Sequence, residues 1–265
     1  MSDQVDLYSS TYGNFQAQVL AEIRRETYGK DIGQNSWITT DELDTVYEWL
    51  NLSAGDHVLE IASGSGGPAL YLAQKFQARI TGIDINEEGI KTANRQALDA
   101  RITDAKFQLA DVTQPLPFDN ESFDAVMCMD SMNHFRDRPS VLQEWYRVLR
   151  EGRRILFTDP VVITGPVSNE ELAARSSIGF FLFVPLESTK NFVKEAGFRL
   201  IRCEDVTQNV QLTSGRWHAS RQKHREDLIK IEGQERFEGL QKFLSTVHSL
   251  SSERRLSRFV FLAEK

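Results

Sequence analysis

The sequence predicts an α/β protein built on a doubly wound, mostly parallel sheet. Four short apolar runs, at 58–61, 79–85, 107–112 and 123–129, alternate with longer amphipathic or polar segments. Runs of this length are typical of buried strands, and the segments between them are long enough for the helices that join parallel strands. A glycine-rich turn directly after the first run also supports this class.

The first run, its turn and the helix that follows form the most informative stretch of the chain. The turn SGSGG at 63–67 follows the strand VLEI at 58–61, and Pro68 stands where helices often begin. Glycines let the backbone of such a turn approach a ligand closely, and its free N–H groups face anionic groups. The stretch therefore predicts a site for a nucleotide-like cofactor, and hence an enzyme.

Two classes of cofactor fit this turn. The spacing Gly64-x-Gly66-x-x-Ala69, with an acid at Asp84, matches the dinucleotide fingerprint of NAD enzymes. Glu60 disfavours a dinucleotide, because a carboxylate at the end of the strand repels a pyrophosphate. A carboxylate there suits a ligand that carries an ammonium group and a sulfonium, as S-adenosyl-L-methionine (SAM) does.

Two later runs also end in acidic residues. Asp84 ends the second run, where a carboxylate can bind both ribose hydroxyls, and Ile85 can lie against an adenine face. Asp111 ends the third run, where it can accept a hydrogen bond from the adenine amine. Ligands of open α/β sheets bind outside the carboxyl ends of the strands, so we expect these acids to converge with Glu60 on one crevice. Any one acid could instead cap a helix, but three in register favour the cofactor site.

These motifs resemble those of class I SAM-dependent methyltransferases, in the small-molecule branch that includes ubiquinone-type, sarcosine/dimethylglycine, phosphoethanolamine and sugar methyltransferases. The matching segments are VLEIASGSGG, TGIDIN, LADVTQPLPFDNESFDAV and EWYRVLREGRRILFTD, within residues 46–159. An upstream match at 28–37 resembles the segment that closes over SAM in this branch. The chain departs from the family pattern at Ala62 and Arg153, where glycine is usual or common.

The resemblance implies a seven-stranded Rossmann-like sheet with an antiparallel last strand and a helical cap. It also implies transfer of a methyl group from the cofactor SAM to an oxygen, nitrogen or activated carbon atom of a small metabolite. The candidate cofactor-binding residues are Tyr28, Gln34, Trp37, Glu60, Ala62, Gly64, Gly66, Asp84, Ile85, Asp111, Val112 and Met129.

The segment 130–134 follows the fourth run, where the methyl group should point. His134 is the candidate general base, because an imidazole with an unperturbed pKa of about 6.5 can accept a proton at cellular pH. The resemblance implies that Asp130 also contacts substrate or SAM, so both residues are candidate catalytic residues. The alternative is that His134 caps the next helix or donates to a backbone carbonyl.

The candidate substrate contacts lie in the predicted roof of the site. Phe180 and Phe183 could line an apolar pocket or pack inside a cap. Arg216 and Trp217 begin a basic cluster that could recognise a carboxylate or phosphate, or form a solvated helix face. Further lid candidates are Tyr8, Tyr12 and again Tyr28. The cysteines have no metal-ligand spacing, so we expect no metal site.

The chain divides into core segments and inserted caps. Residues 1–38 are a predicted N-terminal helical lid segment, and residues 39–163 are the predicted SAM-binding Rossmann-like core. Residues 164–186 are a predicted cap insertion and residues 212–253 a helical one. The predicted core resumes at 187–211 and ends in the last strand at 254–265. A strand is predicted at 153–158, and a closing antiparallel pair at 199–205 and 258–263. This much cover indicates a small substrate.

The composition indicates a cytoplasmic protein without nucleic-acid or membrane partners. The net charge is −7, whereas nucleic acids and anionic membranes favour a basic surface. Two cysteines suit a reducing compartment, and the start MSDQVDLYSS lacks the parts of a signal peptide. We expect a monomer or homodimer that acts on a small-molecule methyl acceptor. Two alternatives stay open: an NAD-type dehydrogenase, and a catalytically silent SAM-binding partner protein.

Overall fold

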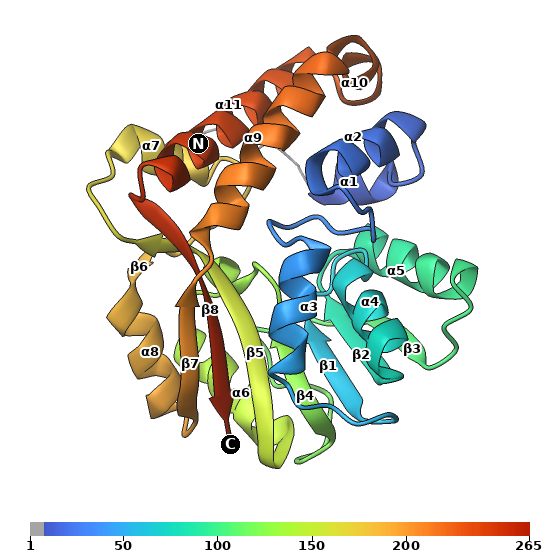
Figure 1. The fold of residues 1–265 in the computed structure, drawn as a ribbon, viewed down its shortest axis with the longest axis vertical. Coiled ribbons are helices and arrows are strands. Elements are labelled where there is room, and N and C mark those ends of the chain that lie inside the picture. The colour runs from blue at the N-terminus through green and yellow to red at the C-terminus, as the bar shows by residue number, and fades with distance from the viewer. Residues whose placement is uncertain (1–7) are drawn as a thin grey trace.

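A mixed β-sheet with the strand order β3-β2-β1-β4-β5-β8-β7 runs through the computed structural model, which describes residues 8–265 (Figure 1). β8 is antiparallel to both neighbours, whereas the other pairs on this path are parallel. A short strand, β6, pairs with β5 beside the path. This arrangement confirms the predicted fold class, including the antiparallel last strand. The strands are β1 (His57–Ile61), β2 (Arg79–Asp84), β3 (Ala105–Leu109), β4 (Phe123–Cys128), β5 (Leu149–Ile163), β6 (Val184–Pro185), β7 (Arg199–Asp205) and β8 (Leu256–Glu264).

Helices cover both faces of the sheet, and a further group lies beyond the carboxyl ends of its parallel strands (Figure 1). The helices on the faces are α3 (Thr40–Glu48), α4 (Gly67–Phe76), α5 (Glu87–Asp99), α6 (Arg138–Val148) and α8 (Leu186–Glu195). The further group is α1 (Tyr8–Gly13), α2 (Gln18–Tyr28), α7 (Asn169–Arg175), α9 (Thr207–Lys223), α10 (Arg225–Glu232) and α11 (Gln234–Ser252). None of the helices within residues 8–265 is both long and apolar enough to cross a membrane. The first seven residues of the predicted lid segment lie outside the described residues.

Strand β1 shows why the short runs of the sequence are continuously apolar. Val58 packs in the core under α3, α4 and α5, whereas Leu59 and Ile61 pack in the core under α6. Because helices cover both faces of a parallel strand, successive side chains are all buried. Glu60 is buried in this run as well, at 2% exposure, and this placement of a carboxylate bears on the site.

One predicted strand is longer in the structure, and one predicted cap contains a helix. The strand predicted at 153–158 extends over Leu149–Ile163, because β8 pairs with it along most of that length. The predicted cap at 164–186 contains α7, which begins after Ser168 in a capping box with Glu171. The predicted closing pair at 199–205 and 258–263 is confirmed as β7 and β8.

A buried ion-pair cluster ties the last strand to the carboxyl end of β4. Arg258 of β8 is 0% exposed, and its Nε donates to Asp130 Oδ1 at 2.5 Å. Its Nη1 donates to the carboxylate of Glu42 on α3. The other carboxylate oxygen of Asp130 accepts the backbone N–H of Trp37 at 2.8 Å. The cluster therefore holds β4, β8, α3 and the segment before α3 together at the edge where the parallel strands end.

Removing the cation of this cluster should destabilise the fold strongly. Arg258→Met leaves the carboxylates of Asp130 and Glu42 buried without their partner, so we expect the free energy of unfolding to fall by about 3–5 kcal/mol. Arg199→Met is the control, because the ion pair of Arg199 with Glu264 is exposed and should contribute less than about 1 kcal/mol. Denaturant unfolding measures both variants. Similar small losses in the two would show that the cluster does not hold this edge.

Candidate active site

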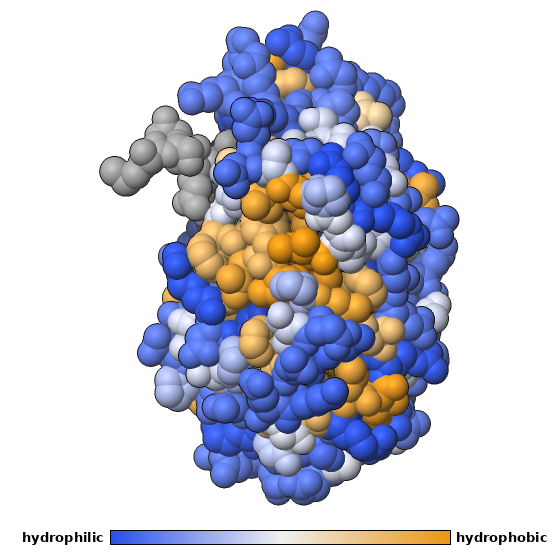
Figure 2. Space-filling model, turned by 90° about the vertical axis from the view of Figure 1, so that its left-hand side faces the viewer, coloured by the Kyte–Doolittle hydropathy of each residue, from blue (hydrophilic) through white to orange (hydrophobic). Residues whose placement is uncertain are grey.

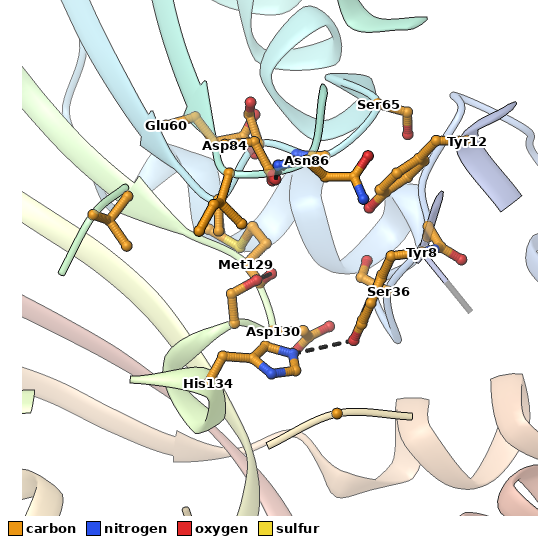
Figure 3. Close-up of a pocket in the computed structure, with 18 of the residues that line it drawn as sticks. Tyr8, Tyr12, Ser36, Glu60, Ser65, Asp84, Asn86, Met129, Asp130 and His134 are labelled. Carbon is orange, nitrogen blue, oxygen red and sulfur yellow. Dashed lines mark hydrogen bonds between the residues drawn. The ribbon is translucent and has the colours of Figure 1, made fainter. Parts of the chain in front are cut away.

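A cavity of about 360 Å³ lies at the carboxyl ends of the parallel strands (Figure 3). Residues at the ends of β1, β2 and β4 and the turn before α4 line one side. Helix α1 and the segments 35–36 and 178–179 line the other side. Figure 3 shows Glu60 and Asp84 at one end of this space and His134 at the other. The cavity thus joins an acidic end to an end that carries an imidazole.

Ten of the predicted site residues line this cavity: Glu60, Ala62, Gly64, Asp84, Ile85, Asp111, Val112, Met129, Asp130 and His134. Both lid candidates of α1, Tyr8 and Tyr12, line it as well. The lining also includes polar residues that were not individually predicted, although several lie in segments predicted for the site: Asn35, Ser36, Ser63, Ser65, Asn86, Thr113 and Ser131. The position of Asn86 before a helical segment is typical of an N-cap, and its side chain does cap α5. The sequence thus predicts this structural role.

The two predicted glycines of the turn have different structural reasons. Gly64 has a φ of +51° and lies against Tyr12, so that a Cβ at Gly64 would meet the tyrosine hydroxyl. Gly66 has a φ of +80°, and a Cβ there would come within 2.8 Å of Phe107 and 2.9 Å of Ala93. Gly66 therefore serves the packing of the turn on β3 and α5, and it does not line the cavity as a cofactor contact was expected to.

The carboxylate of Asp84 anchors this turn. Its Oδ2 accepts the backbone N–H of Gly64 at 2.8 Å, and its Oδ1 accepts that of Asn86 at 2.7 Å. Burial raises the pKa of Asp84, and these backbone donors oppose the rise. Ala62 adopts a φ of +54° in the anchored turn, which is a strained conformation for a residue other than glycine.

Glu60 is a buried carboxylate without a full set of partners. It is 2% exposed, and its Oε2 has no hydrogen-bond partner within the described chain. Burial, and then the charge of Asp84, raise the pKa of Glu60 well above its usual range. Buried polar atoms are rarely left unpaired, so the geometry fits a cationic donor from a ligand. Residues 8–265 contain no group of three or more His, Cys, Asp or Glu side chains that could hold a metal ion.

The rim of the cavity near β2 and β3 suits a flat heterocycle with a polar edge. Ile85 follows β2 and is 70% exposed, so an apolar surface faces any ligand there. Asp111 is exposed, and its Oδ1 accepts the N–H and the hydroxyl of Thr113 at 2.9 and 2.7 Å. These bonds fix the direction of the carboxylate. Val112 and Met129 are buried and supply apolar lining.

His134 is held in one tautomer. Its Nδ1 lies 3.0 Å from the carbonyl oxygen of Phe180, which can only accept, so Nδ1 carries the proton. The lone pair of Nε2 therefore faces the hydroxyl of Tyr8, at 3.1 Å (Figure 3). Burial lowers the pKa of His134 to about 4, and the bond to Phe180 opposes this shift. At neutral pH the imidazole is thus neutral, and its Nε2 can accept the hydrogen bond of the Tyr8 hydroxyl.

Asp130 lines the same end of the cavity, but its carboxylate serves the fold. Both of its oxygens are bonded: Oδ2 to the Trp37 N–H, and Oδ1 to Arg258 and to the hydroxyl of Thr158 at 2.8 Å. Its φ of +57° shows that the chain turns sharply here to bring the carboxylate under the lid segment. These bonds give the carboxylate a structural role, and the predicted contact of Asp130 with substrate or SAM stays a prediction, since the residue also lines the cavity.

Three predicted cofactor contacts lie outside the cavity lining and hold the lid segment instead. The hydroxyl of Tyr28 donates to the carbonyl oxygen of Ser36 at 2.7 Å. The amide of Gln34 bonds to backbone groups at Ile32 and Lys30. The ring of Trp37 packs in an apolar cluster with α9 and α11. Their side chains are buried by packing of the segment against itself and the cap, which local sequence does not specify.

The four predicted substrate contacts also lie outside the cavity lining. Phe180 and Phe183 are partly buried in the segment between α7 and β6. Figure 2 shows a broad apolar patch on the side of the molecule where Figure 1 shows α7 and α8. Arg216 is exposed on α9, as expected for a solvated helix face. Trp217 packs against Tyr28 and Trp37, with ring centroids 6.4 and 5.9 Å apart.

The sequence matches known proteins over this core and beyond it. Residues 59–157 match the family model described as "Methyltransferase domain". The chain is 30% identical over 259 residues to 27-O-demethylrifamycin SV methyltransferase of Amycolatopsis mediterranei (strain S699), which covers 92% of this chain and 89% of that relative. The chain belongs to the methyltransferases.

Solved structures share the fold of this methyltransferase. Cyclopropane synthase MmaA2 from Mycobacterium tuberculosis superposes with a TM-score of 0.83 at 17% identity, over 97% of each chain. Haemonchus contortus phosphoethanolamine N-methyltransferase 2, in complex with phosphomonomethylethanolamine and S-adenosylhomocysteine, gives a TM-score of 0.81 at 19% identity, over 98% of this chain and 60% of that one. The methyltransferase is SAM-dependent.

The lining of the cavity fits SAM. The unpartnered oxygen of Glu60 could hold the ammonium group, and the remaining lone pairs of Asp84 could accept the ribose hydroxyls. Asp111 could accept from the adenine amine while Ile85 covers the adenine face. Of these, Glu60 offers the sharpest test, because the protein alone leaves its oxygen unpaired.

Neutralising Glu60 should separate cofactor binding from folding. Glu60→Gln keeps the shape of the side chain but removes its charge, so we expect SAM affinity to fall at least ten-fold. The ligand-free variant should melt at the same temperature as the wild type or higher, because a buried carboxyl group without a cation is removed. Titration calorimetry and thermal unfolding measure the two effects. Glu48→Gln, exposed on α3, is the control and should bind SAM normally.

The raised pKa of Glu60 also gives SAM binding a pH dependence of definite sign. The free protein favours protonated Glu60, whereas an ammonium group favours the carboxylate. SAM affinity should therefore rise as the pH increases above the ordinary carboxyl range, as long as the pH stays below the range where an α-amino group loses its proton. The rise should be smaller in Glu60→Gln, where Asp84 alone still titrates. Unchanged affinity and an unchanged pH profile in the variant would place the ammonium group elsewhere.

Proposed function

We propose that this methyltransferase methylates a hydroxyl oxygen of a small metabolite, with His134 as the base. The observation that carries the proposal is the neutral imidazole whose Nε2 lone pair faces the cavity beside the Tyr8 hydroxyl. A hydroxyl acceptor needs such a base, because its proton must leave as the oxygen bonds to the methyl carbon. The O-methylation that the name of the rifamycin relative describes supports this choice of acceptor.

SAM, when bound, supplies a methyl group that is already activated by a sulfonium. The residues of the chain therefore need to align the acceptor, exclude water and accept one proton. We assign Glu60, Asp84 and Asp111 to the ammonium group, ribose and adenine of the cofactor. Tyr8 and Tyr12 of α1 close the cavity over the site, which supports a reaction shielded from solvent.

The proton passes to a defined atom. In the proposed reaction, His134 Nε2 takes the hydroxyl proton, directly or through the Tyr8 hydroxyl, as the acceptor oxygen forms its bond to the methyl carbon. SAM, when bound, would supply this methyl carbon and keep the electron pair of the carbon–sulfur bond. The carbonyl oxygen of Phe180 keeps its bond to Nδ1–H and stabilises the imidazolium that forms.

We further propose that the enzyme works in the cytoplasm, without nucleic acid, as a monomer or homodimer. The net charge of −7 supports the absence of nucleic-acid partners. Residues 1–38, 164–186 and 212–253 are proposed to act as the lid and caps. Bonds from Glu26 on α2 to Ser220 and Lys223 on α9 support joint movement of lid and cap. Light scattering on the purified enzyme tests the oligomeric state.

Substituting the base should lower turnover with little effect on the cofactor. For His134→Ala we expect the turnover number to fall by about 10²–10⁴ fold while SAM affinity stays within a few-fold of the wild type. Tyr8→Phe should lose less, because Nε2 remains in place. His218→Ala is the control, since His218 lies on α9 outside the cavity lining. If His134→Ala keeps a turnover number near that of the wild type, His134 is not the general base.

The pH profile adds a second readout. Because the pKa of His134 is lowered to about 4, the base is already deprotonated across neutral pH. We expect the wild-type rate to fall only at acidic pH and to stay level near neutrality, after correction for SAM binding. A rate that rises through the ordinary histidine pKa of about 6.5 would contradict a buried, neutral imidazole.

A further inference from the structure

A small recess adjoins the His134 end of the cavity. It has a volume of about 30 Å³ and shares part of its lining with the cavity, including Tyr8, Ser36 and Asp130, which Figure 3 shows around His134. The walls that belong to the recess alone include the rings of Phe181 and Phe243. A group on a ligand in the cavity could therefore reach the recess past Tyr8.

Arg175, the last residue of α7, lies in this recess with its charge unpaired. It is 2% exposed, its Nη1 has no hydrogen-bond partner within residues 8–265, and no carboxylate forms an ion pair with it there. Burial lowers the pKa of Arg175, but only to about 10, so the guanidinium is charged at neutral pH. A buried cation without an anion is costly, which is why such groups are usually paired.

The other buried arginines of the described chain all have a carboxylate partner. Arg138 pairs with Asp159 at 2.6 Å, Arg221 with Glu232, and Arg258 with Asp130. The carboxylates whose charges act on Arg175 belong to Asp130 and Asp159. Each of them already forms an ion pair with one of these other arginines. The fold thus supplies anions for its structural cations and none for Arg175.

Aromatic rings hold the guanidinium of Arg175 in place. Its Cζ lies 4.7 Å from the ring centroid of Phe181, 5.1 Å from that of Phe243 and 5.8 Å from that of Trp37. Rings attract a cation through their faces, but they accept no hydrogen bond of the strength that a carboxylate does. The cage fixes the orientation of the guanidinium and leaves its N–H donors for another group.

We propose that the methyl acceptor carries a carboxylate, which Arg175 binds in this recess. The proposal rests on the proposed methyl transfer and adds the class of acceptor. A planar carboxylate matches a single guanidinium fork. A phosphate dianion would call for more positive charge, and no second cation is among the residues that line the recess. Asn133, whose Oδ1 is also buried without a partner, can turn its amide to offer a second donor.

The distance between the two ends of the acceptor is also constrained. The ring of Phe181 touches both groups, with its centroid 4.7 Å from Arg175 Cζ and 4.9 Å from the ring centroid of His134. The carboxylate and the methylated hydroxyl must therefore be separated by little more than an aromatic ring. This geometry selects compact hydroxy acids over long or uncharged acceptors.

Matched acids and amides test the proposal by binding. The probes are 4-hydroxybenzoate, salicylate and 3-hydroxybutyrate, each paired with its amide, titrated into the full chain saturated with S-adenosylhomocysteine. We expect at least one acid to bind ten-fold or more tightly than its amide. Arg175→Met should abolish that preference, and Arg175→Lys should keep part of it, because lysine retains the charge but not the fork. Arg95→Met, exposed on α5, should behave as the wild type.

Thermal unfolding separates binding from packing. Arg175→Met removes an unpaired buried charge, so the ligand-free variant should melt at the wild-type temperature or above. A melting temperature several degrees below the wild type, or no acid of the panel preferred over its amide, would overturn the carboxylate site. Neither result tests the assignment of the chain as a SAM-dependent methyltransferase. Failure to bind S-adenosylhomocysteine at all would instead count against the proposed cofactor site.

Discussion

Buried charge at the carboxyl edge of the sheet is the constraint around which the rest of this molecule is arranged. Parallel strands end together at this edge, and the chain places carboxylates and guanidinium groups there, away from water. Each such charge needs a partner, because an isolated one is costly in a protein interior. Groups that have a counter-ion within the described chain form a structural part of this edge. Groups that have none form a binding part.

In the structural part each buried arginine has a carboxylate as its counter-ion. Asp130 meets Arg258 and the backbone of the lid segment, and Asp159 meets Arg138 and, through it, α6. These pairs join the last strands to the helices that cover the cavity, so the walls of the site are set by the same contacts that hold the fold. In the binding part, Glu60 and Arg175 have no counter-ion within residues 8–265. Glu60 lacks a cationic partner and lines the cavity, whereas Arg175 lacks an anionic partner and lines the adjoining recess.

The sequence predicts those parts of the site that depend on residues close together in the chain. A strand, a glycine turn and a helix start follow one another within 58–73, and an acid at the end of each strand falls at the same edge by topology alone. For that reason Glu60, Asp84 and Asp111 could be assigned to one cavity. Gly66 shows the limit of this reasoning, because its φ value was foreseeable but its contact with Phe107 depends on how β3 and α5 pack.

Residues placed by long-range packing could not be assigned from the sequence. Trp37 and Trp217 look like ligand contacts in a motif and a basic cluster, yet they pack against each other across the lid and the cap. Arg175 reads as an ordinary cation at the end of a capped helix, which favours solvent exposure. It is buried by residues far away in the sequence, including Trp37 of the lid segment and Phe243 of α11. The tautomer and the lowered pKa of His134 likewise depend on a carbonyl group 46 residues away, at Phe180.

The most direct measurement is a crystal structure of the enzyme with S-adenosylhomocysteine. We expect the amino group of the ligand against the Oε2 of Glu60, its ribose hydroxyls on Asp84 and its sulfur toward the end of the cavity that holds His134. A ligand bound outside this cavity, or with its amino group away from Glu60, would contradict the view that the buried ionisable groups without a counter-ion mark the binding site at this edge.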